Sequence, residues 1–155
     1  MEIPEHLYAD VNPVMMDKVF SNLLLNAIRY TPEEKGNHIR VLLKPGTDTE
    51  TVYCQIENTG VFIPEEALVH LFEAFYRVEQ SRNRQTGGSG LGLYIVKMIL
   101  DQHGASYRMG NTCDGVCFSF LYKITQRITY KLQLHYKIQW YGMDIIKNVK
   151  ELDVQ

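Results

Sequence analysis

The chain of 155 residues has 45% apolar and 22% charged residues, proportions typical of one globular domain with a buried core. Its net charge of −2 gives no basis for general nucleic-acid binding. No apolar run approaches the roughly 20 residues that span a bilayer, and no basic segment followed by an apolar stretch indicates a signal peptide. Three cysteines without a Cys-x-x-Cys pattern indicate a reducing, cytosolic setting, and five scattered histidines form no metal-ligand pair.

The first predicted element is a helix that begins at Asn12-Pro13 and ends at Thr31-Pro32. Within it, Asn22 and Asn26 lie four residues apart and Arg29 lies three further on, so helical periodicity places all three on one face. Apolar residues gather on roughly the opposite side and predict the core stripe: Met16, Phe20, Leu23, Leu24 and Ala27. The polar face is either an ordinary solvated surface or part of a site, and this stretch alone does not decide between them.

A hairpin is predicted next, because residues 37–43 and 50–57 are rich in Val, Ile, Leu and Tyr and turn residues lie between them. A short helical stretch is predicted after Pro64, with apolar residues at helical spacing: Leu68, Leu71, Phe72 and Phe75.

The second long helix is predicted over residues 91–104, with Gly104 as its stop and a buried face formed by Leu91, Ile95, Met98 and Ile99. A second hairpin is expected in residues 105–122, with its turn near Gly110-Asn111 or Asp114-Gly115. These elements predict an α+β two-layer sandwich, with helices on one face of a mixed, mainly antiparallel sheet.

The segment GGSGLGL, residues 87–93, stands at the start of this second helix, after a polar stretch from residue 79 that we expect to be mobile. Glycines at positions 88, 90 and 92 let a ligand approach the backbone closely, and a helix N-terminus favours anions such as phosphate. The segment is not a P-loop, because no Gly-Lys-Ser/Thr follows, and its spacing fails the Rossmann pattern. A flexible turn and a phosphate site of another class both remain open at this point.

Four motifs in fixed order carry a resemblance to a known family: NLLLNAIRYTP, ENTGVFIP, FEAFYR and GGSGLGLYIVK, with DGVCFSF after them. Over roughly residues 10–122 the chain resembles the ATP-binding domain of bacterial sensor histidine kinases. This domain belongs to the superfamily of gyrase-type topoisomerases and the ninety-kilodalton heat-shock chaperone, which shares the Bergerat fold. The resemblance implies an ATP-binding catalytic domain over residues 1–123, with a lid at about 64–90 that covers the ATP.

The resemblance also implies roles for individual residues. Asn26 would give its side-chain oxygen to the Mg²⁺ that bridges the ATP phosphates, with Asn22 and Arg29 beside it in the catalytic set. Arg77, Arg82 and Arg84 in the lid would be candidates for contacting the γ-phosphate. The remaining implied ATP contacts are Tyr30, Asn58, Gly60, Ile63, Gly88, Gly90, Leu91, Gly92 and Leu93.

Two positions depart from the family pattern. Asn58 falls where the family has an aspartate that accepts the adenine amine, and Phe62 falls where it has a glycine. An amide oxygen accepts the same hydrogen bond without charge assistance, so we expect ATP binding to survive but weaken by about 1 kcal/mol. Glu57 is an alternative acceptor, although alternation along a strand should point it the other way.

The expected reaction is transfer of the γ-phosphoryl group of Mg-ATP to a phosphoacceptor histidine. We expect that histidine in a separate dimerisation domain of a longer, inner-membrane protein that also has a response-regulator partner. The alternative is a nucleotide-binding or scaffold module without kinase activity, related to anti-sigma-factor kinases or to degenerate kinases. The upstream coding sequence would discriminate the two.

The family does not explain residues 124–155. From residue 124 to 140, apolar side chains fall almost entirely on even positions, a period typical of a strand. Such a strand must bend, fold back or pair with another chain, and we expect self-association through residues 124–141. The alternative is a disordered tail.

Overall fold

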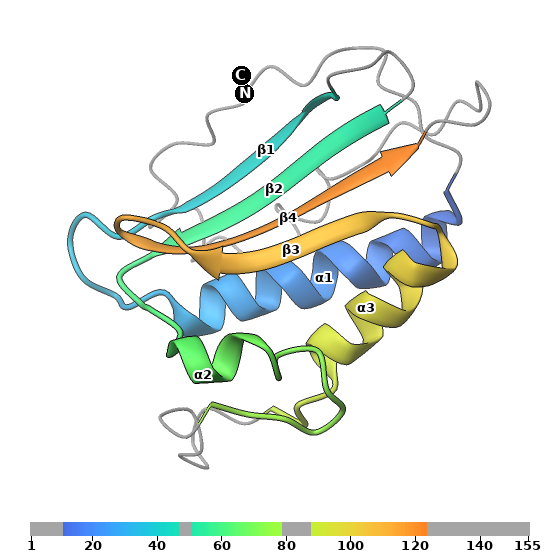
Figure 1. The fold of residues 1–155 in the computed structure, drawn as a ribbon. Coiled ribbons are helices and arrows are strands. Elements are labelled where there is room, and N and C mark those ends of the chain that lie inside the picture. Colours follow the sequence, from blue (N-terminus) through green and yellow to red (C-terminus); the bar gives the residue numbers. More distant parts are fainter. Residues whose placement is uncertain (1–10, 47–50, 79–87, 124–155) are drawn as a thin grey trace.

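The computed structural model describes residues 11–46, 51–78 and 88–123. Within these ranges the chain forms three helices and four strands, arranged as two layers (Figure 1). In chain order the elements are α1 (Pro13–Tyr30), β1 (Ile39–Pro45), β2 (Thr51–Thr59), α2 (Glu65–Leu68), α3 (Gly92–Gln102), β3 (Ser106–Asn111) and β4 (Gly115–Lys123).

The four strands form one sheet in the order β1-β2-β4-β3, and every neighbouring pair is antiparallel. Both predicted hairpins are present, β1 with β2 and β3 with β4, and the second one turns at Thr112–Asp114. The predicted fold class is confirmed, and among the described strands the sheet is antiparallel throughout. β4 lies between β2 and β3, so Lys123 ends an interior strand of the described sheet.

Helices α1 and α3 cover one face of this sheet (Figure 1). The start of α1 follows the prediction, because Oδ1 of Asn12 accepts hydrogen bonds from the N–H groups of Val14 and Met15, and Pro13 occupies the first turn. The buried side chains of α1 are those of the predicted stripe with Val19 added, while Leu24 is partly buried against the core. The sheet contributes alternate residues to the same core, as period two requires.

The predicted buried face of α3 is wrong in part. Ile95 is 37% exposed and Met98 is 50% exposed, whereas Val96, Ile99 and Leu100 are buried. The helix is apolar on two neighbouring stripes, so periodicity alone does not select one of them. Packing against α1 and β3 selects the stripe of Val96 and Leu100.

The expected run of helical spacing after Pro64 ends early. α2 has only four residues, and although Leu71 is buried, Phe75 is 72% exposed and has a φ of 65°. An aromatic residue with positive φ is strained, so the surrounding structure must hold it there.

Side-chain hydrogen bonds join α3 to its neighbours. Lys97 pairs with Asp101 one turn later, and the Tyr107 hydroxyl donates to Oδ1 of Asp101 at 2.9 Å, which ties α3 to β3. The hydrogen bond from Lys97 is the main cause that lowers the pKa of Asp101. At the end of the helix, the Asn12 N–H donates to Nε2 of His103 at 3.2 Å, which joins the end of α3 to the start of α1.

None of the helices that the structure describes combines the length and the hydropathy needed to cross a bilayer. The predicted tail, residues 124–155, and the stretch of the expected lid from 79 to 87 lie outside the described residues.

Candidate functional site

The polar face of α1 meets the first residue of α3. Asn22 and Asn26 are half-buried, and Nδ2 of Asn22 donates to the Lys18 carbonyl at 2.8 Å, which fixes the orientation of that amide. A Cβ on Gly92 would lie 3.0 Å from Oδ1 of Asn22 and 3.8 Å from Nδ2 of Asn26. The absence of a side chain at Gly92 therefore keeps both amides accessible at the start of α3.

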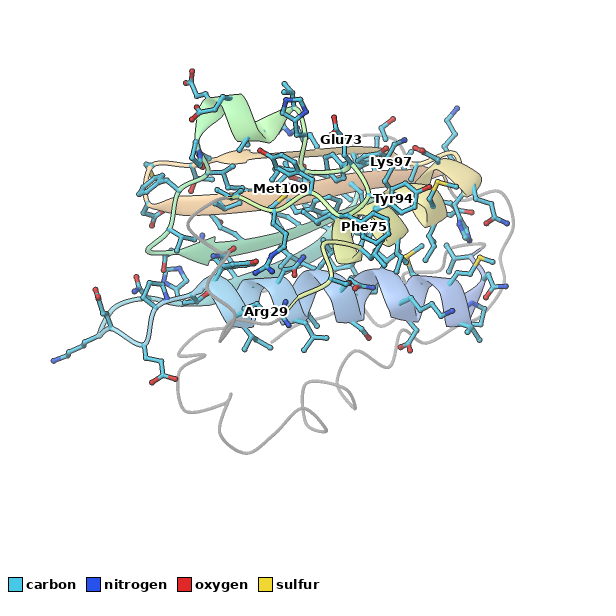
Figure 2. All side chains as sticks on the ribbon, turned by 90° about the horizontal axis from the view of Figure 1, so that it is seen from below. Arg29, Glu73, Phe75, Tyr94, Lys97 and Met109 are labelled. Atoms are coloured by element: carbon cyan, nitrogen blue, oxygen red, sulfur yellow. The ribbon has the colours of Figure 1, made fainter. Side chains whose placement is uncertain are left out.

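The glycine segment continues along the same face of α1. A Cβ on Gly88 would lie 2.5 Å from a guanidinium nitrogen of Arg29, so this glycine and this arginine are immediate neighbours. In Figure 2, Arg29 projects from α1 toward the segment that leads into α3. Leu91, at the N-cap of α3, makes no side-chain capping bond, so the first backbone N–H groups of α3 have no cap there. Uncapped N–H groups, bare glycines and a cation together favour an anion such as phosphate.

The backbones of Phe75 and Gly90 are in direct contact, and both residues have a positive φ. The Phe75 N–H donates to the Gly90 carbonyl at 3.0 Å, and Gly90 has a φ of 72°. A Cβ at position 90 would lie 2.7 Å from the Phe75 carbonyl carbon. This contact fastens the segment after α2 to the segment before α3, and Figure 2 shows Phe75 beside α3.

Asn58 is the buried polar group of the site. This residue, which is 8% exposed, lies on the face of β2 that looks toward the helices, and its Nδ2 has no hydrogen-bond partner among the described residues. Across the strands it pairs with Ile39 and Val116, both buried and apolar. A buried donor without a partner costs about 1–3 kcal/mol, so an acceptor brought to Nδ2 would stabilise this group.

Glu57, the alternative acceptor, lies on the other face of the sheet. Its carboxylate is 3.8 Å from the Arg40 guanidinium and accepts a hydrogen bond from Gln55 at 3.3 Å. The expectation that strand alternation points Glu57 away from Asn58 is confirmed, because these contacts lie on the face opposite the helices.

The turn after β2 is held from two sides. Gly60 has a φ of 82°, and a Cβ there would lie 2.6 Å from the Asn37 amide. Its N–H donates to the Asp114 carbonyl at 2.9 Å. The Asn111 side chain then pairs with the backbone of Ile63 through two hydrogen bonds, each 2.8 Å long. Phe62, which departs from the family pattern, points outward and is 58% exposed, so its bulk does not enter the turn.

Sequence reasoning missed Asn111. It lies 48 residues from Ile63 along the chain, and no local pattern indicates that its side-chain amide hydrogen-bonds the backbone of Ile63. The only sequence signal is its place beside Gly110, and that pair predicts a turn.

The structure also describes four further residues that the sequence analysis assigned to the site. Tyr30 is the last residue of α1 and is 38% exposed, while Leu91, Leu93 and Arg77 are half-buried. Arg82 and Arg84 lie outside the described residues.

The two-layer sandwich, in which two asparagines of α1 lie beside the start of α3, has the fold predicted for a Bergerat-type ATP-binding domain. The sequence pattern of the family described as histidine kinase-, DNA gyrase B-, and HSP90-like ATPase matches residues 11–126. The chain belongs to this family.

Its relatives are sensor kinases. The chain is 40% identical over 117 residues to the sensor protein VanSB of Enterococcus faecalis, which covers 76% of this chain and 25% of VanSB. It is 34% identical over 98 residues to the sensor histidine kinase WalK of Bacillus subtilis, covering 63% of this chain and 16% of WalK. The chain therefore spans a quarter or less of the length of these two relatives.

Solved structures give the same result for the fold. The nucleotide-free catalytic domain of the histidine kinase ThkA is similar with a TM-score of 0.62 at 28% identity, covering 74% of this chain and 71% of that one. ThkA in complex with the response regulator protein TrrA is similar with a TM-score of 0.60 at 26% identity, covering 78% of this chain and 32% of that one. ATP binding is the property that this ATPase family implies for the chain.

Proposed function

We propose that this chain is the catalytic module of a sensor histidine kinase, which transfers the γ-phosphoryl group of Mg-ATP to a histidine elsewhere in the whole protein. The observation that carries the proposal is the close approach of Gly92 to the amides of Asn22 and Asn26. This approach brings the amide oxygen of Asn22 and the amide group of Asn26 beside a helix start that attracts phosphate.

The phosphate side of the site would use α1 and the glycine segment. Asn26 would hold Mg²⁺ through its side-chain oxygen, since Mg²⁺ prefers oxygen ligands and keeps several waters. Asn22 and Arg29 would contact the phosphates, supported by the proximity of Arg29 to Gly88. The bound Mg²⁺ would neutralise charge on the phosphates, while the protein supplies position and an anion-favouring backbone.

The base side would use the end of β2 and the turn that follows. Asn58 would hydrogen-bond the adenine edge, a role that its unpartnered Nδ2 supports, and Gly60 and Ile63 would line the base. Tyr30 would flank the nucleotide from the end of α1. The backbone of Gly88, Gly90, Leu91, Gly92 and Leu93 would wrap the phosphate tail, and Arg77 would contact it from the lid.

The whole protein would contain more than this module. We place the module at residues 1–123, with its lid at about 64–90, and the phosphoacceptor histidine in a dimerisation domain outside it. The modest share of VanSB that the chain covers supports a longer parent, whose membrane spans and response-regulator partner are also proposals.

The proposal is tested by titrating the chain with a fluorescent ATP analogue with and without Mg²⁺. Saturable binding that Mg²⁺ tightens is expected, and Asn26→Ala should remove the contribution of Mg²⁺ while leaving weaker, metal-independent binding.

Asn12→Ala is the matched control for this variant. It removes an asparagine from the same helix and costs about 1 kcal/mol of stability through its cap, but it leaves the site intact. It should therefore keep the full effect of Mg²⁺. An absence of binding at millimolar nucleotide would refute the proposal.

The alternative, a nucleotide-binding module without kinase activity, is favoured by one observation, the neutral residue at position 58. Both functions predict ATP binding. Transfer of labelled γ-phosphate from ATP to the histidine of the whole protein distinguishes them, because only the kinase forms a labelled, acid-labile product.

A further inference from the structure

Asn58 brings both a donor and an acceptor to a position where a carboxylate would bring acceptors alone. An ionised carboxylate has two oxygens that only accept hydrogen bonds, whereas an amide has one accepting oxygen and one donating nitrogen. The donating end is the unusual feature here, because Nδ2 of Asn58 is buried and has no partner among the described residues.

The amide of Asn58 is also not held in one orientation through its nitrogen. Rotation about the last side-chain bond exchanges the oxygen and the nitrogen, and this rotation breaks no hydrogen bond from Nδ2 to any of the residues that the structure describes. Its cross-strand neighbours Ile39 and Val116 are apolar and offer neither a donor nor an acceptor side chain. The orientation can therefore follow the ligand.

No carboxylate on the same strand restores a purely accepting site. Glu57 lies on the opposite face of the sheet, where Arg40 and Gln55 contact it. At this end of β2, the side chain that can hydrogen-bond a ligand on the face toward the helices is therefore the Asn58 amide.

Purine bases differ at the edge that such an amide would contact. Adenine has a donating amine at C6 and an accepting N1, whereas a 6-oxopurine (guanine or hypoxanthine) has an accepting oxygen at C6 and a donating N1–H. A carboxylate matches the amine and repels the carbonyl oxygen. An amide matches adenine in one orientation and a 6-oxopurine in the other.

We propose that Asn58 makes this site accept 6-oxopurine nucleoside triphosphates as well as ATP, so that residue 58 sets the base specificity. This inference rests on the proposed function, because it assumes that the base of a nucleotide lies against β2. It goes further by naming a second substrate class and the residue that admits it.

The test compares dissociation constants for ATP and inosine triphosphate, measured by displacement of a fluorescent ATP analogue from the 155-residue chain. Inosine triphosphate is the better first probe, because hypoxanthine has the 6-oxo edge without the additional 2-amino group of guanine. The wild-type chain should bind the two nucleotides within about tenfold of each other.

Asn58→Asp is the diagnostic variant, measured at about pH 8 so that its carboxyl is ionised. Its preference for ATP over inosine triphosphate should be at least about tenfold greater than that of the wild type, because an unpaired polar contact and a repelled carbonyl both disfavour the 6-oxopurine. Glu57→Gln is the matched control, since it changes a carboxylate one residue away on the other face and should leave the preference unchanged.

The outcomes separate the inference from the proposed function. Wild-type protein that binds ATP more than about a hundredfold tighter than inosine triphosphate overturns the inference and leaves the proposed function intact. Wild-type protein that binds neither nucleotide refutes both. If Asn58→Asp does not fold, as judged by circular dichroism, the wild-type preference still decides.

Discussion

Gly90→Ala tests whether the contact between Phe75 and Gly90 shapes the nucleotide site. Alanine at this position would keep a φ of 72°, which costs an L-residue about 1–2 kcal/mol. Its Cβ would also lie 2.7 Å from the Phe75 carbonyl carbon and 2.9 Å from its Cα and carbonyl oxygen. Ordinary carbon contacts begin near 3.5 Å, so the overlap with the carbonyl carbon is about 0.8 Å, and it involves backbone atoms that cannot rotate away.

The segment from Gly88 to Leu91 must then move, which breaks the hydrogen bond from the Phe75 N–H and costs about 0.5–1.5 kcal/mol more. The two costs together predict a loss of about 1.5–3.5 kcal/mol in the free energy of unfolding. ATP affinity should also fall by about tenfold or more, because the displaced segment is the one that would wrap the phosphates.

Gly104→Ala is the matched control for this variant. Gly104 has a similar φ of 64°, but a Cβ there would meet no atom within 4 Å. It should therefore lose only the conformational part, about 1–2 kcal/mol, and should bind ATP normally. Urea unfolding gives the stabilities, and titration with the fluorescent analogue gives the affinities. Equal stability losses with normal ATP binding in both variants would refute the reasoning.

Two further predictions address other parts of the structure. Asn111→Ala removes both hydrogen bonds to the turn after β2 and should weaken ATP binding by about fivefold. Thr112→Ala should not weaken it, because the Thr112 hydroxyl bonds only within its own hairpin turn. Equal affinities of the two variants in a side-by-side titration would show that the Asn111 hydrogen bonds do not support the site. Burial raises the pKa of the Cys54 thiol, whereas Cys113 is exposed, so a thiol-reactive dye followed by mass spectrometry should label Cys113 in the folded protein and Cys54 only after unfolding. Labelling of both at the same rate in the native state would contradict the buried position.

The sequence by itself determined the features that depend on short stretches of chain. The start of α1 follows from Asn12-Pro13 and its end from Thr31-Pro32, because caps and prolines act on adjacent backbone groups. The common face of Asn22, Asn26 and Arg29, the two hairpins and the alternation that turns Glu57 away from Asn58 follow from fixed helical and strand periods. The order of the motifs was sufficient to identify the family.

The tertiary structure alone decided which of several compatible local patterns is used. Two stripes of α3 are apolar, and only packing against α1 and β3 selects the one with Val96 and Leu100. The positive φ of Phe75 depends on Gly90, and the turn after β2 depends on Asn111, 48 residues away from Ile63. The unpartnered Nδ2 of Asn58 likewise follows from which strands flank β2. Such contacts join segments that are far apart in sequence, and since the chain's local preferences do not encode them, they exist only once the two layers have packed.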